Sequence, residues 1–109
     1  MKYEVVLTSE ARENARAAYD WYAERSQEAA DKWHAGLLDA LTTLETDPQR
    51  CGLANENARF PVELRQLLYG SGRRITHRIV FAIRPARVVV YAIRHVAQQD
   101  WKPDIDPSA

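Results

Sequence analysis

The stretch RITHRIVFAI, Arg74–Ile83, has the clearest periodic pattern in the chain. His77, Ile79 and Phe81 fall on one face of an alternating strand, whereas Arg74 and Arg78 fall on the other face together with Val80 and Ala82. Alternation over this length predicts a β-strand with one packed face and one open face. We therefore expect His77 on the packed face and Arg78 in the middle of the open face.

Two more strands are predicted beside this one. Residues 62–69 form an apolar-rich run that ends at a Gly-Ser-Gly turn. Residues 87–94 follow a Pro-Ala turn and are almost entirely apolar at their centre, which is typical of an inner strand. The three segments together predict an antiparallel arrangement in which neighbouring strands are joined by short turns.

The first half of the chain is predicted to be mostly helical. A short β-rich run over residues 3–7 precedes two stretches with apolar residues at helical spacing, residues 9–25 and 26–46. Serine or threonine stands at the start of each stretch and can cap the helix. Almost nothing separates the two helices, so they should fold back as a hairpin. Residues 49–61 have no periodicity and are expected to form a loop.

The expected order of elements is β-α-α-β-β-β, in the α+β class. The helix hairpin should pack on one face of a small antiparallel sheet and leave the other face free to display arginines. A chain of this length is expected to form a single domain, residues 1–109. Its tail, residues 96–109, is expected to be either flexible or packed on the sheet edge.

The charge of the chain is unevenly distributed, although the formal net charge is zero. Residues 59–95 contain eight arginines, one acid, Glu63, and no lysine, whereas residues 1–58 contain six bases and eleven acids. Arginines concentrated on a rigid sheet indicate an anionic partner, either nucleic acid or an acidic protein segment.

Several kinds of site are not expected. The single cysteine, Cys51, cannot form an internal disulfide, which fits a cytoplasmic protein, and we interpret it as an incidental loop thiol. No stretch has the roughly 20 apolar residues that span a bilayer, so no membrane partner is expected. His77 and His95 have no cysteine or carboxylate at metal spacing, so neither a metal site nor a cofactor is predicted.

The basic surface supplies the candidate binding residues. Arg78 is its expected centre, and Arg65 can reach the same area if the strand register allows. Because Arg78 is expected on an open face, its replacement by alanine should cost no more than about 1 kcal/mol of stability. His95 ends the last strand, where a titratable side chain can be structural or can meet a ligand. Trp101 either packs over a sheet edge or contacts a partner. The residues predicted to bind a target or partner are Arg65, Arg74, Arg78, Arg94, His95 and Trp101.

The whole pattern resembles the RelE/ParE superfamily of bacterial toxins. The opening YEVVLTSEA over residues 3–11, the strand RITHRIVFAI, and the closing VVVYAIRH over residues 88–95, followed by Asp100-Trp101, carry the resemblance in this order. The resemblance implies the toxin of a type II toxin–antitoxin pair, of the ParE-like, plasmid-stabilisation type. It also implies neutralisation by the C-terminal segment of a cognate antitoxin.

The superfamily divides by target, and the resemblance leaves three activities open. ParE-like members bind DNA gyrase without bond-breaking chemistry, and the neutral charge, lysine-free sheet and long tail of this chain favour that activity. RelE-like members cleave mRNA on the ribosome, and in that case Arg65, Arg78 and His95 are the candidate catalytic residues. A third alternative is an inactive toxin that only binds its antitoxin.

Overall fold

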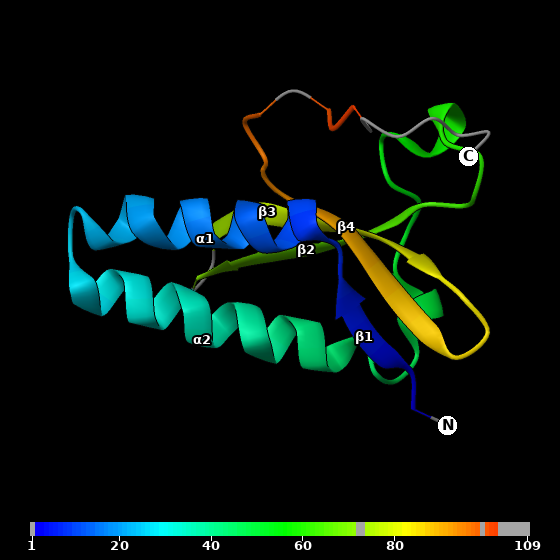
Figure 1. The fold of residues 1–109 in the computed structure, drawn as a ribbon, viewed down its shortest axis with the longest axis horizontal. Helices are drawn as coiled ribbons and strands as arrows, with labels where there is room; N and C mark the ends of the chain where they lie inside the picture. Colours follow the sequence, from blue (N-terminus) through cyan, green and yellow to red (C-terminus); the bar gives the residue numbers. More distant parts are fainter. Residues whose placement is uncertain (1, 72–73, 99, 103–109) are drawn as a thin grey trace.

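The computed structural model describes residues 2–71, 74–98 and 100–102 of the 109-residue chain, and Figure 1 shows their arrangement. The elements follow the predicted order. They are β1 (Glu4–Leu7), α1 (Ser9–Ala23), α2 (Gln27–Thr43), two short 3₁₀ turns η1 (Pro48–Arg50) and η2 (Asn57–Arg59), β2 (Arg65–Ser71), β3 (Arg74–Ile83) and β4 (Arg87–His95).

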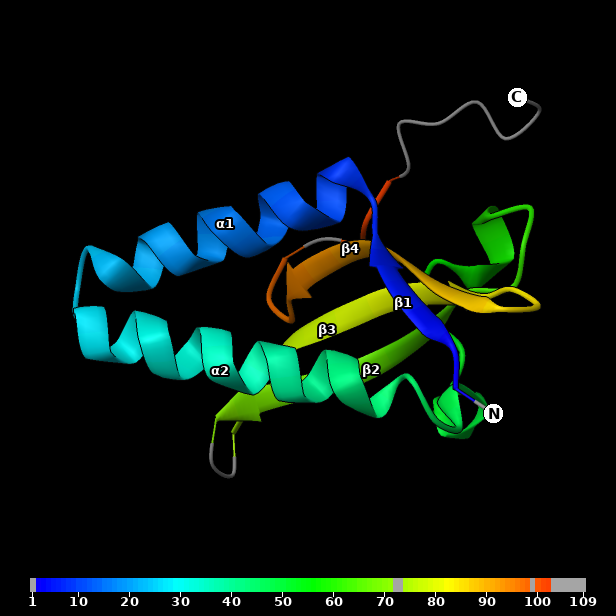
Figure 2. The ribbon, with the colours of Figure 1, turned by 60° about the horizontal axis from the view of Figure 1, so that its bottom comes forward.

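The two helices form the expected hairpin and lie side by side across the strands (Figure 2). Each begins at a capping side chain: Thr8 Oγ1 accepts a hydrogen bond from the amide of Ala11 at 3.1 Å, and Ser26 Oγ accepts one from Ala29 at 3.2 Å. These caps satisfy amides that have no partner within the helix. Only three residues separate the helices, so the second must turn back along the first.

The sheet has the strand order β1-β4-β3-β2. The strands β2, β3 and β4 are antiparallel, and β4 is an inner strand, so both predictions are confirmed. The sheet as a whole is mixed rather than antiparallel, because β1 runs parallel to β4 with Val6 opposite Val89. The long helical connection between β1 and the later strands permits this parallel pairing, which a short hairpin could not make.

Both faces of the sheet are covered. On one face, Ile79, Phe81 and Val90 pack against the helices. On the other face, a second cluster joins strand residues such as Val80 to Leu64 and to the tail. The expectation of one free face is therefore wrong. Val80, Ala82 and Ala92 on this face are apolar, and the loop before β2 and the tail provide the cover that buries them.

Candidate functional site

Arg78 lies on the face away from the helices, as predicted, but it is buried. It is 4% exposed, and Glu56 is 1% exposed. Arg78 Nη1 donates to Glu56 Oε1 at 2.8 Å, and Nη2 donates to Oε2 of the same carboxylate. Arg78 Nη1 also donates to Gln66 Oε1 at 3.2 Å. The prediction that Arg78 is the centre of an open basic surface is therefore wrong, because its two-pronged contact is with a carboxylate of the same chain.

Glu56 connects the loop, the sheet and the tail at one point. Its carboxylate accepts a third hydrogen bond from the backbone amide of Trp101 at 2.6 Å. Burial alone would raise the pKa of Glu56, but the Arg78 guanidinium and this amide more than offset it and leave the pKa below its usual value. Glu56 lies in the aperiodic loop and was not predicted as a site residue. Val80 and Ala82, which share a strand face with Arg78, indicate that this face is covered, but no local pattern identifies Glu56 as the partner of Arg78.

Arg65 lies on the opposite face of the sheet from Arg78. The register pairs Arg65 with Phe81, on the helix side, and pairs Leu68 with Arg78. The Arg65 guanidinium donates to the carbonyl of Cys51 at 2.5 Å and forms an ion pair with Glu63 at 2.9 Å. Arg65 therefore anchors the loop around η1, and the expectation that it reaches the same area as Arg78 is wrong.

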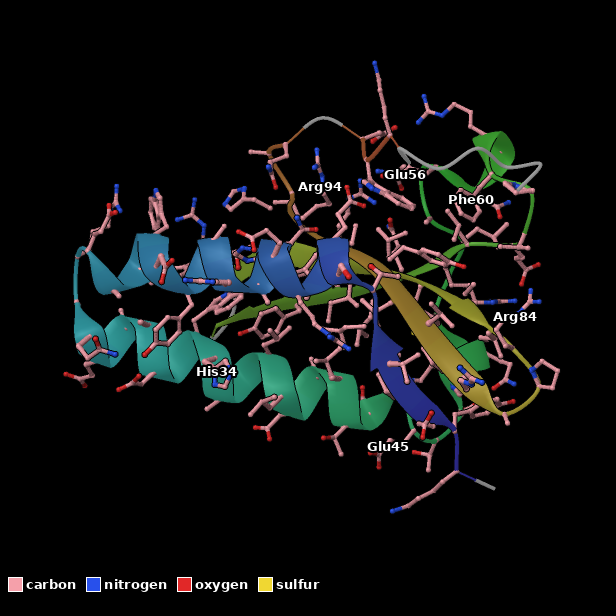
Figure 3. All side chains as sticks on the ribbon, viewed as in Figure 1. His34, Glu45, Glu56, Phe60, Arg84 and Arg94 are labelled. Atoms are coloured by element: carbon pink, nitrogen blue, oxygen red, sulfur yellow. The ribbon has the colours of Figure 1, made fainter. Side chains whose placement is uncertain are left out.

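The remaining predicted residues of the strands are distributed along the sheet. Arg74 is exposed at the start of β3. Arg94 is half-buried opposite Arg78, and Figure 3 shows it on the side of the molecule where Glu56 and the tail lie. His95 is exposed and pairs with His77, with their ring centroids 5.2 Å apart.

The three candidate catalytic residues do not come together. Arg78 is enclosed on one face, whereas Arg65 and His95 are paired with helix-side positions of β3. Those positions, Phe81 and His77, are four residues apart, which corresponds to roughly 13 Å along a strand. The sequence placed these side chains on neighbouring strands, but only the register could show that they lie apart.

Trp101 packs against the protein itself, but on the face of the sheet rather than over the sheet edge that was expected. It is 2% exposed and stacks on Tyr91, with ring centroids 5.7 Å apart and Phe60 at 5.6 Å. Its indole Nε1 donates to Glu10 Oε2 at 2.7 Å, which links the tail to the first turn of α1. Trp101 is thus packed on the face of the sheet, at Tyr91 of the inner strand β4, and residues 99 and 103–109 of the predicted tail lie outside the described residues.

A cavity of about 430 Å³ opens between α1 and the ends of β3 and β4. Its walls include Trp21, which is half exposed, and the pair His77 and His95. His77 is buried, as the alternation predicts. Burial, and secondly the neighbouring His95, lower the pKa of His77 from 6.5 to about 4, so its imidazole is neutral near pH 7.

A second depression, of about 590 Å³, follows the helix hairpin. Leu37, Leu38 and Leu41 form much of its floor, and Leu38 is half exposed. Arg12 and Arg16 stand at its α1 side. The helix-hairpin groove, as we call it, therefore combines an apolar floor with guanidinium groups.

Other classes of site receive no support from the described part of the chain. Across residues 2–71, 74–98 and 100–102, no group of three His, Cys, Asp or Glu side chains is placed to hold a metal ion. None of the described helices has the length and hydropathy of a membrane-crossing segment. Cys51 is a buried thiol in the loop, and burial raises its pKa. Arg73, one of the eight arginines of residues 59–95, lies outside the described residues.

Comparison with known structures supports the fold. A solved structure described as "Chromosomal ParDE TA system from P. aeruginosa" is similar to this chain, with a TM-score of 0.71 and 20% sequence identity. The similarity covers 87% of this chain and 97% of that chain. At this identity the likeness shows the same arrangement of helices and strands. No curated protein sequence matched this chain.

Comparison with protein families identifies the chain more directly. A family model described as the ParE toxin of the type II toxin–antitoxin system parDE matches residues 5–100. The matched region contains all the described strands and helices except the first residue of β1. The chain therefore belongs to the ParE toxin family of type II toxin–antitoxin systems.

Proposed function

We propose that this ParE-family chain halts growth by binding DNA gyrase in the cytoplasm, and that a cognate antitoxin neutralises it by binding directly. Binding, rather than cleavage, is the proposed mode of action. No cofactor is required, because the protein acts through the surface that it presents to its target.

The observation that carries this proposal is the position of the three candidate cleavage residues. In-line cleavage of RNA needs a base and cationic groups around one phosphate. Arg78 instead is closed off by Glu56, and Arg65 bonds loop carbonyls on the other face. His95 lines the cavity on the helix side, beside His77. Because these residues do not surround one phosphate site, the arrangement favours inhibition by binding and disfavours ribonuclease activity.

The helix-hairpin groove is the proposed site for the antitoxin. A half-exposed leucine on an apolar floor favours an amphipathic partner segment, which would bury apolar side chains in the groove. Arg12 and Arg16 favour acidic residues on the same partner segment. The chain of similar fold carries the name of a ParDE toxin–antitoxin system, which supports an antitoxin as the partner of this chain.

Two assays run side by side test the target. Purified full-length chain should inhibit DNA supercoiling by gyrase, and prior mixing with the antitoxin should restore it. The same preparation should leave ribosome-bound mRNA uncut. Site-specific mRNA cleavage with unaffected gyrase would overturn the proposal in favour of the nuclease. If neither assay responds while the antitoxin still binds, the chain is an inactive antitoxin-binding protein.

A matched pair of leucines tests the antitoxin site. Leu38 is 50% exposed in the groove, and Leu53 is 53% exposed in the loop before β2. Leu38→Glu should weaken antitoxin binding by about tenfold or more, because it places a charge in an apolar contact. Leu53→Glu makes the same change elsewhere and should leave the affinity unaltered. Equal affinities for both variants would move the antitoxin site away from the groove.

A further inference from the structure

The cavity between α1 and the ends of β3 and β4 is lined by polar side chains whose acceptor atoms are engaged and whose donor groups have no partner among the described residues. Asn14 Oδ1, on its wall, accepts a hydrogen bond from the amide of Ile93 at 3.0 Å. Gln98 Oε1, also on the wall, accepts one from the amide of His95 at 2.8 Å. Both carboxamides therefore have their oxygen engaged. Within the described residues, neither side-chain NH₂ group has a partner.

His95 adds a third donor of the same kind. Its Nδ1 accepts a hydrogen bond from the amide of Ala97 at 3.0 Å. A ring nitrogen that accepts carries no proton, so the neutral imidazole has its proton on Nε2 and donates from there. Three side chains that line the cavity thus each have an engaged acceptor and an N–H donor that no described residue uses. None of the described residues that line the cavity is acidic.

The rest of the cavity is apolar and aromatic. Ala17, Ala18 and Trp21 of α1, with Ile93 of β4, form this part of its surface. The volume of about 430 Å³ is large enough for one or two amino-acid residues. A ligand that satisfies both parts needs an apolar body and, next to it, a group that only accepts hydrogen bonds.

We propose that this cavity is a carboxylate-binding pocket that holds the C-terminal residue of a partner polypeptide, with an apolar last side chain. The α-carboxylate accepts from Asn14, Gln98 and His95, and the side chain packs against Trp21. A C-terminal residue carries its carboxylate directly beside its side chain, as the cavity requires. The proposal does not depend on whether the target is gyrase.

Other ligands fit the cavity less well. A phosphate group normally binds through arginine or lysine, and neither is among the described residues that line the cavity. A metal ion would have two imidazoles but no third ligand among the described residues. In addition, a metal on His95 Nε2 would require a proton on Nδ1, where the amide of Ala97 already donates.

The test uses a small probe and the full-length chain. N-acetyl-glycyl-leucine with a free carboxylate is titrated against the ¹⁵N-labelled protein, and its C-terminal amide serves as the comparison. The free acid should produce saturable shifts at the Trp21 indole and the Gln98 side chain. The amide should bind about tenfold more weakly, because it loses charge-assisted hydrogen bonds. Equal binding of acid and amide, or no shift at these groups with either probe, would overturn the proposal.

Isosteric variants complete the test. Asn14→Asp keeps the oxygen that accepts from Ile93 but replaces the free donor with a negatively charged oxygen, so it should abolish binding of the acid. Asn57→Asp is the matched control. Asn57 is also half-buried, accepts from the amide of Leu64 at 2.8 Å and lies outside the cavity. Thermal melts confirm that both variants fold. Unchanged binding by a folded Asn14→Asp chain would contradict the assigned site.

Discussion

Arg78 and Glu56 form the ion pair on which the second core depends. Arg78→Ala leaves the Glu56 carboxylate buried without its cationic partner, so it should lower the free energy of unfolding by about 3–5 kcal/mol. This reverses the expectation of about 1 kcal/mol that an open face implied. Urea denaturation measures the change. A loss within about 1 kcal/mol would show that the pair is not closed in solution.

A double variant controls for the charge. Arg78→Met with Glu56→Gln removes both charges and keeps comparable side-chain volumes. It should be considerably more stable than Arg78→Ala alone, because no uncompensated charge remains buried. If toxicity is lost in Arg78→Ala but returns in the double variant, the loss reflects folding rather than a missing target contact.

His77 gives the stability of the chain a dependence on pH. The native pKa is about 4, and the unfolded chain has the ordinary 6.5, so only the unfolded chain takes up this proton in between. The stability that comes from burying a neutral His77 is fully present above pH 6.5. It is lost as the pH falls towards 4, which lowers the free energy of unfolding by at most about 3 kcal/mol. Urea denaturation across this range should show the decline. His77→Gln should make the decline in stability less steep. An equally steep decline in that variant would assign the pH dependence to other groups.

The alternation in RITHRIVFAI identified the burial of His77 but not that of Arg78. Alternation assigns each residue to a face, and for His77 the helices predicted what covers that face. For Arg78 the cover comes from the loop and from Trp101, segments without periodicity. Their position depends on contacts between residues far apart in the chain, such as Glu56 and Trp101. The faces were therefore predictable, whereas the buried pair was not.

At the scale of elements, the local signals were sufficient for the helices and for three strands. Capping residues and apolar spacing predicted α1 and α2, and short turns predicted the antiparallel pairing of β2, β3 and β4. The parallel place of β1 was not predictable, because a strand before a long connection has no turn that fixes its direction. The register between β2 and β3 was not predictable either, and it places Arg65 and Arg78 on opposite faces of the sheet.

The tail acts as an element because Trp101 holds it to the sheet and to α1. Trp101→Ala removes a fully packed ring from the cluster with Phe60 and Tyr91 and should cost about 3–5 kcal/mol. Trp101→Phe keeps most of the packing and removes the indole bond to Glu10, so its cost should be smaller, about 1–3 kcal/mol. Thermal or urea unfolding distinguishes the two. Equal losses would mean that the hydrogen bond, rather than the packing, secures the tail.

At the scale of the whole molecule, folding divides the basic segment. Two acids from outside residues 59–95 neutralise two positive charges of this segment. Glu56 pairs with Arg78, and Asp100 pairs with Arg59. Arg74 is exposed at the start of β3. The other exposed arginines of the described segment include Arg84 and Arg87, at the hairpin between β3 and β4, which lies at the far end of that strand. The arginine-rich sequence thus does not become one continuous basic surface.

This division predicts weak binding to RNA. The hairpin arginines lie about ten residues from Arg74, roughly 30 Å along a strand, so a single-stranded RNA can engage only one end with a few phosphates. The logarithm of the binding constant should fall with the logarithm of salt concentration with a slope of about 2 or less in magnitude, from about 0.7 per phosphate. Fluorescence anisotropy with a labelled oligonucleotide measures this slope. Replacing Arg84 and Arg87 by glutamine should remove most of the salt dependence of binding. A slope of about 5 or more would reveal a continuous phosphate-binding surface and would favour a nucleic-acid target.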